Sequence, residues 1–232
     1  MKWTLLFLFV FFLLLAPMTM MAQANSDGLN FTGGVAYSTL EVDKWNDYID
    51  QSNQNLSEIA SEANADLDKM DNIDQILVYY FGVEKWINDK IKVGGRFEHI
   101  PGEIDYKISE GVGNGSIEVE LQGYILNMGY KLNDSWNLTG ALGWYDGDKT
   151  HNHEGVLTTD PYNLPEKETF DVEGNSQKLG LEYDKDWRGN WSFTAKASYR
   201  WMTVEDKNPE TGEDREQDNN GIELNAGLSY AF

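Results

Sequence analysis

The feature that most constrains this chain is a period-two alternation of apolar and polar residues. From Ile222 to Phe232, every second residue is apolar or aromatic, and the residues between them are polar or small. Successive side chains of a strand point to opposite faces, so this segment has one lipid-like face and one lumen-like face. No second apolar run long enough for a transmembrane helix follows residue 24. Passage through a membrane therefore requires a closed barrel, because only helices and barrels satisfy the whole backbone in lipid.

Seven further segments alternate in the same way, at residues 29–38, 77–84, 91–98, 117–130, 136–144, 178–183 and 191–201. Eight is an even number, as closure of an antiparallel barrel requires. The predicted fold class is all-β: an eight-stranded antiparallel up-and-down transmembrane β-barrel. Within 117–130 the apolar parity changes at Gly123, which we interpret as a β-bulge. A soluble lipocalin-like barrel is the alternative, but its inward face would be apolar.

The connections alternate in length. Short polar turns are expected at Asn88-Asp89, Asn133-Asp134 and 188–190, and the long links cover about 42–73, 101–115, 146–173 and 205–219. Short periplasmic turns alternating with long external loops are the outer-membrane arrangement. Two aromatic girdles are expected, one on each side of the membrane. Their members are Trp86, Tyr130, Trp136, Trp187, Trp191 and Phe232 on the periplasmic side, and Tyr37, Phe97, Trp144 and Trp201 on the other.

The N-terminus indicates export. Lys2 precedes an apolar run from Trp3 to Ala16, which is followed by Pro17 and by Ala-Gln-Ala at 22–24. This order is typical of a cleavable signal peptide, although a retained anchor of similar length is the alternative. We therefore predict a signal peptide at 1–24, a barrel domain at 25–232 and location in the cell outer membrane. The chain has no cysteine, so no disulfide stabilises it.

The charge is strongly negative and unevenly distributed. The formal net charge is −21, and the four long links with their rims hold 28 of the 39 acidic residues. Nucleic acid is an unlikely partner because phosphate contacts need a basic face. The acidic loops either bind divalent cations, repel ligands or suit high salt, or they are simply solvated. Within the first link, Asn55 and Glu58 indicate the start of a helix whose apolar face holds Leu56, Ile59, Ala60, Ala63, Leu67 and Met70.

The polar parity of the eight segments would face the lumen and carries eleven charges. They are Glu84, Lys92, Arg96, Glu98, Glu118, Glu120, Lys178, Glu182, Lys196, Arg200 and Glu223. Unpaired charges in so narrow a space would be costly, and the interior of an eight-stranded barrel is only wide enough for its own side chains. We expect a salt-bridged network that closes the lumen. A conduit that opens transiently is the competing interpretation.

The chain resembles the small eight-stranded outer-membrane barrels of the OmpA transmembrane-domain, OmpX and opacity-protein type. The resemblance rests on the Ser-Tyr-Ala-Phe end and on the Gly-Val-Glu-Lys-Trp-Ile-Asn-Asp-Lys-Ile hairpin at 82–91, and it extends over 25–232 as a pattern. It implies that Tyr230 and Phe232 form the signal read by the barrel-assembly machinery, and that the lumen is plugged.

Three functions remain open at this point. The preferred one is a non-enzymatic, monomeric barrel in outer-membrane lipid that displays loops for surface interaction, and a narrow porin-like channel is the second. The third is an envelope lipid-modifying enzyme, for which His151 and His153 would form a weak metal site. No catalytic constellation marks the sequence, and no cofactor is expected.

Overall fold

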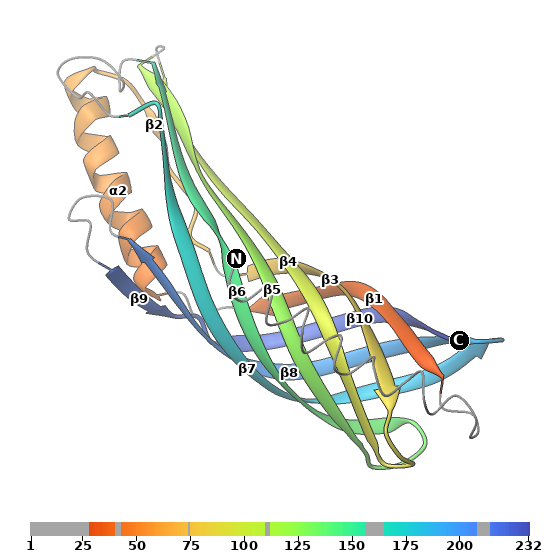
Figure 1. The fold of residues 1–232 in the computed structure, drawn as a ribbon. Coiled ribbons are helices and arrows are strands. Elements are labelled where there is room, and N and C mark those ends of the chain that lie inside the picture. Colours follow the sequence, from red (N-terminus) through yellow and green to blue (C-terminus); the bar gives the residue numbers. More distant parts are fainter. Residues whose placement is uncertain (1–27, 40–42, 74, 110–111, 156–164, 208–213) are drawn as a thin grey trace.

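A computed structural model describes residues 28–39, 43–73, 75–109, 112–155, 165–207 and 214–232. Eight strands close into a ring in which every neighbouring pair is antiparallel (Figure 1). In ring order they are β1 (Leu29–Thr39), β3 (Gln75–Trp86), β4 (Ile91–Ile108), β5 (Gly113–Lys131), β6 (Trp136–Gly155), β7 (Lys167–Arg188), β8 (Trp191–Lys207) and β10 (Gly221–Ala231). The predicted up-and-down barrel is confirmed. The predicted signal peptide at 1–24 lies outside the described residues.

Three smaller elements accompany the ring. Helix α2 (Asp43–Glu62) and the two-residue strand β2 (Leu67–Asp68) lie between β1 and β3 in the sequence, and β9 (Asp214–Asp218) pairs with β8. Figure 1 shows β4 to β7 running well past β1, β3 and β10, toward α2. Within the described part of the chain, no helix has the length and apolarity needed to cross a membrane.

The short turns form where the sequence predicts them, and asparagine side chains explain two of them. The Asn88 Oδ1 accepts hydrogen bonds from the backbone N–H groups of Lys90 and Ile91, both at 2.9 Å. The Asn133 Oδ1 accepts equivalent bonds from Ser135 and Trp136, both at 3.0 Å. Such a side chain caps its own backbone and fixes the turn. These turns hold β3 against β4 and β5 against β6 in register.

Strand β5 shows that the chemistry of the two barrel faces exchanges along its length. Its C-terminal half has the predicted arrangement, with Met128 exposed on the outside and Gly129 buried inside. In its N-terminal half, Ile117 and Leu121 are buried inside while Glu118 faces outward. The pairing of β5 with β4 and β6 has no register shift, so the predicted bulge at Gly123 is wrong.

The glycine at position 123 has a different physical reason. A Cβ built there would lie 2.4 Å from the Tyr145 Cε1, so only glycine lets the aromatic ring pack against the strand. The polarity pattern inverts because the surroundings of the barrel change from lipid to water. An unbroken strand keeps the same parity inward, and only the solvent preference of that parity reverses.

The same exchange occurs on four other long strands, at one level of the barrel. Outward-facing residues change from apolar to polar after Phe97 on β4, Trp144 on β6 and Trp201 on β8, and between Leu179 and Gln177 on β7. Three of these positions belong to the predicted outer girdle. We call the part with an apolar outer face the apolar band, and the strands beyond it the distal extension. The band is the membrane-spanning section.

The links differ from the sequence prediction because the strands continue into them. The predicted loop at 101–115 is a hairpin extension in which β4 and β5 stay paired as far as Ile108 and Gly113. Similarly, β6 and β7 pair as far as Asn152 and Lys167 in the predicted loop at 146–173, of which 156–164 lie outside the described residues. Regular pairing satisfies the backbone better than an irregular loop does.

The helix of the first link begins at Asp43 rather than at Asn55, so the predicted capping box lies inside it. Leu56 and Ala60 are buried, as the predicted apolar face requires, whereas Leu67 belongs to β2. Two asparagines of α2 hold the returning chain by paired backbone contacts. Asn53 binds the N–H and C=O of Met70, both at 3.0 Å, and Asn46 binds those of Ile73 at 2.8 and 3.1 Å. The strap from α2 to residue 73 is thereby fixed.

Candidate functional site

The interior of the apolar band holds a network of charges, which we call the plug. Nine of the eleven charged residues predicted to face the lumen are buried there: Glu84, Lys92, Arg96, Glu98, Lys178, Glu182, Lys196, Arg200 and Glu223. Glu118 and Glu120 are exposed on the outer face of the distal extension, so their predicted place in the lumen is wrong. Both residues lie on the distal part of β5, where the outer face of the strand is polar. Charged side chains are stable on the outside there because that face meets water and not lipid.

One half of the plug is centred on Lys92 of β4. Its Nζ lies 3.1 Å from the Glu84 Oε2 and 3.3 Å from the Asp184 Oδ2, and it also pairs with Glu182. Asn137 donates to both Glu182 and Asp184, at 3.3 and 2.7 Å. Since β3, β4 and β7 supply the charged groups, the contacts cross the lumen rather than follow one sheet edge.

The other half joins two glutamates to two cations. Lys178 of β7 places its Nζ 2.6 Å from the Glu98 Oε1 and 3.1 Å from the Glu223 Oε2. Arg200 of β8 contacts the same two carboxylates, with its NH2 2.9 Å from the Glu98 Oε2. The Tyr145 hydroxyl donates to the Glu98 Oε2 at 2.8 Å. Each glutamate is thus shared by two buried cations, which offsets the cost of removing these charges from water.

Arg96 lies beside this second half. Its NH1 donates to the Asn225 Oδ1 at 3.3 Å, and its guanidinium carbon lies 4.1 Å from the centroid of the Tyr80 ring, a cation–π contact. Among the described residues, the Arg96 Nε and the Arg200 Nε and NH1 have no hydrogen-bond partner. Buried donors of this kind usually bind water.

Several members of the plug were missed as functional residues by the sequence prediction. They are Asp184, Tyr80, Asn127, Tyr145 and Asn225. Tyr80, Asn127 and Asn225 lie on inward parity within predicted segments, so parity alone could have identified them. Asp184 directly follows the predicted segment 178–183, and extending its inward parity by one step would have included it.

Beyond the plug, the wall of the barrel opens between β3 and β4. These strands pair from Trp86 and Lys92 only as far as Tyr79 and His99. Past that point β4 remains paired with β5, and residues 75–78 of β3 pair only with β1. At the distal end, β2 pairs with Lys107 and Ile108 of β4. We call this bounded gap the window.

The window has a local cause in the sequence. Pro101 stands two residues beyond His99 and has no N–H group to donate to a neighbouring strand. Gly102 follows it and also weakens strand pairing. An edge therefore forms on β4 where the apolar band ends.

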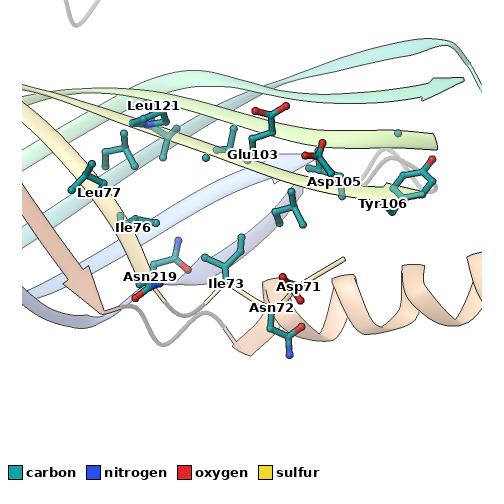
Figure 2. A pocket seen from close by; sticks show the side chains of 18 of the residues that line it. Asp71, Asn72, Ile73, Ile76, Leu77, Glu103, Asp105, Tyr106, Leu121 and Asn219 are labelled. Atoms are coloured by element: carbon teal, nitrogen blue, oxygen red, sulfur yellow. The ribbon is translucent and has the colours of Figure 1, made fainter. Parts of the chain in front are cut away.

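An open cavity of about 1280 Å³ lies behind the window, and we call it the distal cavity. Figure 2 shows lining side chains from β4 and β5 on one side and from the strap on the other. Its apolar lining includes Ile76, Ile100, Ile104, Val119, Leu121, Met202 and Val204. Ile100, Leu121, Met202 and Val204 pack in one cluster with Tyr145, which also contacts the plug. The cavity thus lies directly distal to the plug.

A further buried ion pair lies in the distal extension. Lys149 of β6 pairs with Asp206 of β8, both side chains are fully buried, and Gln217 of β9 donates to the Asp206 Oδ1 at 3.2 Å. Both charged residues lie in segments predicted as loops, so the sequence prediction missed the pair. No sequence signal links two residues on strands separated by β7.

The histidine pair is part of the wall of the distal extension. The His153 Nδ1 lies 2.5 Å from the Tyr106 hydroxyl, and burial lowers the pKa of the His153 imidazole. His151 is buried, and its ring packs edge-on against Phe170 with centroids 5.6 Å apart. In the described ranges, no group of three or more His, Cys, Asp or Glu residues could hold a metal ion. This arrangement is that of packed wall residues.

The C-terminal aromatic residues lie on the outer face at the proximal rim. Phe232 is exposed, and its ring packs edge-on against Phe31 and Tyr230, with centroids 5.0 and 4.7 Å apart. The Phe232 N–H donates to the Leu29 carbonyl oxygen at 3.2 Å. The terminal residue therefore closes the seam between the first and last strands. Its predicted role as an assembly signal stays a prediction.

Comparison with solved structures gives the fold. Ail, the attachment invasion locus protein of Yersinia pestis, in complex with the heparin analogue sucrose octasulfate, aligns with a TM-score of 0.50 and 13% identity, over 90% of this chain and 100% of that one. The outer membrane protein OprG of Pseudomonas aeruginosa aligns with a TM-score of 0.41 and 13% identity, over 90% and 98%. No curated protein sequence matches the chain.

A family model gives the relationship. The model described as Autotransporter beta-domain matches residues 60–213, which is more than half of the chain. The matched range runs from α2 through β8 and so includes most of the plug and the distal extension. The narrower resemblance to the OmpA, OmpX and opacity proteins is not established by these comparisons. The chain belongs to the autotransporter beta-domain family and has the fold of a small outer-membrane β-barrel.

Proposed function

We propose that this protein is a non-enzymatic structural and surface-interaction barrel of the cell outer membrane, with a lumen closed by the plug. The observation that carries the proposal is that Glu98 and Glu223 are each shared by Lys178 and Arg200 across the interior. The distal extension would then stand on the external side, where its acidic outer face meets solvent.

Two features support closure. The plug residues come from β3, β4, β7, β8 and β10, so their contacts span the interior in more than one direction. Opening a path would require several buried ion pairs to break together, and losing one partner of such a pair costs about 3–5 kcal/mol. Thermal opening of a conducting path would accordingly be rare.

The test is single-channel recording of the refolded mature protein in planar bilayers, after heat-modifiable gel migration has shown that the barrel is formed. The wild-type protein is expected to pass no discrete current. Arg200→Ala should introduce measurable conductance because it leaves a space beside Glu98 and Glu223. Glu120→Ala, on the outer face, is the matched control and should stay silent. Reproducible wild-type currents would overturn the proposal.

The second candidate is a narrow porin-like channel for small solutes or ions. It is favoured by the guanidinium nitrogens of Arg96 and Arg200 that have no partner among the described residues, since these donors indicate water inside the plug. If water forms a continuous path, Arg96→Ala should change the ion selectivity of a current already present in the wild type. An unchanged selectivity would remove this candidate.

An enzymatic role has less support. The contact between His153 and Tyr106 is a wall contact, and a lipid-modifying enzyme would need those residues at a reactive centre. His151→Ala and His153→Ala are expected to leave the lipid profile of the envelope unchanged. A changed profile would restore the enzymatic interpretation.

The proposed partners follow from charge and fold. The acidic outer face would attract divalent cations rather than a polyanion such as the sucrose octasulfate bound by Ail. Outer-membrane lipid surrounds the apolar band in this proposal, the assembly machinery reads Phe232, and the barrel acts as a monomer. Calcium titration followed by Trp fluorescence, with Mg²⁺ in parallel, tests the cation contact, and no saturable change would exclude it.

A further inference from the structure

We propose that the distal cavity is a binding site for an amphiphile with an aliphatic body and a primary ammonium head. This inference does not depend on whether the lumen conducts, because the cavity lies on the distal side of the plug. Three independent observations carry it: the apolar lining behind the window, a buried unpartnered acceptor in the lining, and the charge of the rim.

The first observation is an open cavity, one part of whose wall is apolar. Aliphatic side chains and Met202 line the cavity of about 1280 Å³, and the window leaves it open on one side. A packed interior normally contains few voids of this size. Binding sites for small molecules are concave and combine apolar walls with polar groups that fix the orientation of the ligand, and this cavity has aliphatic side chains together with charged and amide side chains.

The second observation is Asn219, which lies in the lining and whose side chain is shown in Figure 2. It is 6% exposed, and within the described part of the chain its Oδ1 accepts no hydrogen bond. A buried carbonyl oxygen without a donor is costly. A ligand that supplies an N–H donor would remove that cost, which selects for a primary ammonium over a head that has no hydrogen to donate.

The third observation is the rim. Four exposed acidic residues lie in the lining: Asp68, Asp71, Glu103 and Asp105. Only two exposed basic residues lie there, namely Lys69 and Lys107. The excess of negative charge raises the local concentration of cations and disfavours anionic heads. The aliphatic part would then lie on Ile100 and Leu121, while the head lies between Asn219 and the rim.

The position of the window makes the distal cavity accessible to lipid-soluble ligands. Its proximal edge is formed at Tyr79 and His99, the last pair between β3 and β4. Leu77 and Tyr79 are exposed on the outer face of β3, where the apolar band ends. A molecule dissolved in the adjacent leaflet therefore meets the opening without crossing the plug.

The experiment is a titration of dodecylammonium into the protein in phosphatidylcholine nanodiscs, followed by NMR of methyl-labelled methionine. Met202 lines the cavity and reports on the site, whereas Met128 is exposed on the outer face of the band and reports on partitioning into lipid. The Met202 methyl resonance is expected to shift saturably. The Met128 resonance should follow only the lipid.

Two variants separate the contributions. A Cβ at Gly102 would have no neighbour closer than 3.7 Å, so Gly102→Trp can fill the cavity without backbone strain and should abolish the Met202 response. If Gly102→Trp does not fold, Gly102→Leu takes its place with a partial loss. Asn219→Ala should weaken dodecylammonium binding about tenfold and leave binding of dodecyltrimethylammonium unchanged, because the latter has no N–H donor.

Charge provides the last control. Asp68→Asn should weaken the binding of both dodecylammonium and dodecyltrimethylammonium. Glu173→Gln, a similar change on the exposed face of β7, should leave the binding of both unchanged. Dodecyl sulfate should not shift Met202 at the concentrations that saturate it with dodecylammonium. The proposal is overturned if the Met202 methyl resonance does not shift with dodecylammonium, or if it shifts equally in the Gly102 variants. It is also overturned if dodecyl sulfate shifts this resonance at the same concentrations.

Discussion

Glu98 is the position at which the energetics of the plug can be measured most directly. Its carboxylate accepts hydrogen bonds from Lys178 at 2.6 Å, from Arg200 at 2.9 Å and from Tyr145 at 2.8 Å, and it is buried. Glu98→Ala leaves two buried cations with only Glu223 to share. Removing one partner of a buried ion pair costs about 3–5 kcal/mol, and the remaining glutamate places the expected loss near the lower limit.

The assay is urea unfolding of the protein refolded into phosphatidylcholine vesicles, followed by Trp fluorescence and extrapolated linearly to zero denaturant. The matched control is Glu120→Ala, which removes a glutamate from the outer face of the distal extension. Its side chain is 63% exposed, and the expected change is within about 0.5 kcal/mol. The reasoning is refuted if Glu98→Ala costs less than about 1 kcal/mol, or if the two variants cost the same.

Three further predictions concern other parts of the chain. Asn53→Ala should release the strap, because the Met70 N–H loses its acceptor; amide hydrogen exchange at Met70 should accelerate while exchange in β8 stays constant. Since burial lowers the pKa of His153 below its unfolded value, the neutral imidazole stabilises the fold above about pH 6.5, and this contribution is lost as pH falls through and below that value. Thermal unfolding of the wild type and of His153→Gln should therefore converge at low pH, and parallel curves would contradict the shift. Phe232→Ala should slow insertion by purified assembly machinery, whereas Phe232→Tyr should insert at the wild-type rate.

Parity and turn residues explain why much of the fold could be predicted. Side chains alternate across a strand whatever the tertiary context, so Lys92, Arg96 and Glu98 could be assigned to one face of β4 from spacing alone. The turns at Asn88 and Asn133 were equally local, because each asparagine caps the backbone of its own turn. These features depend on neighbours in the sequence.

The errors in the sequence prediction arose where the surroundings of the barrel change from lipid to water. The strands themselves continue through this level without interruption. A period-two pattern shows that one face is apolar, but it does not say whether that face is inside or outside. Glu118 and Glu120 lie on the polar face of β5 whether that face points into the lumen or out into water. Only the position of the lipid boundary along the strand shows which of the two is correct. The aromatic residues Trp144 and Trp201 marked that boundary, so applying it to β5 would have placed both glutamates correctly.

The window could not be predicted in the same way. Pro101 indicates a local strand edge, but it does not show which neighbour of β4 stops pairing with it. That depends on the length of β3 and on the path of the strap. Likewise, Lys149 and Asp206 meet only because β6 and β8 both point these side chains inward past β7. Such pairings are set by the closed ring and not by local sequence.

The division of the barrel also restricts where a ligand could bind. In the apolar band the outer face must be apolar, so the inner parity receives the polar residues, and an eight-stranded interior leaves them no room except to pair with one another. Beyond Phe97 and Trp144 that requirement ends. The inner parity of β4 and β5 becomes apolar there, and the wall can open because water can satisfy an unpaired strand edge. A ligand-sized space is therefore compatible with this fold in the distal extension, where the distal cavity lies, and not in the band that the plug fills.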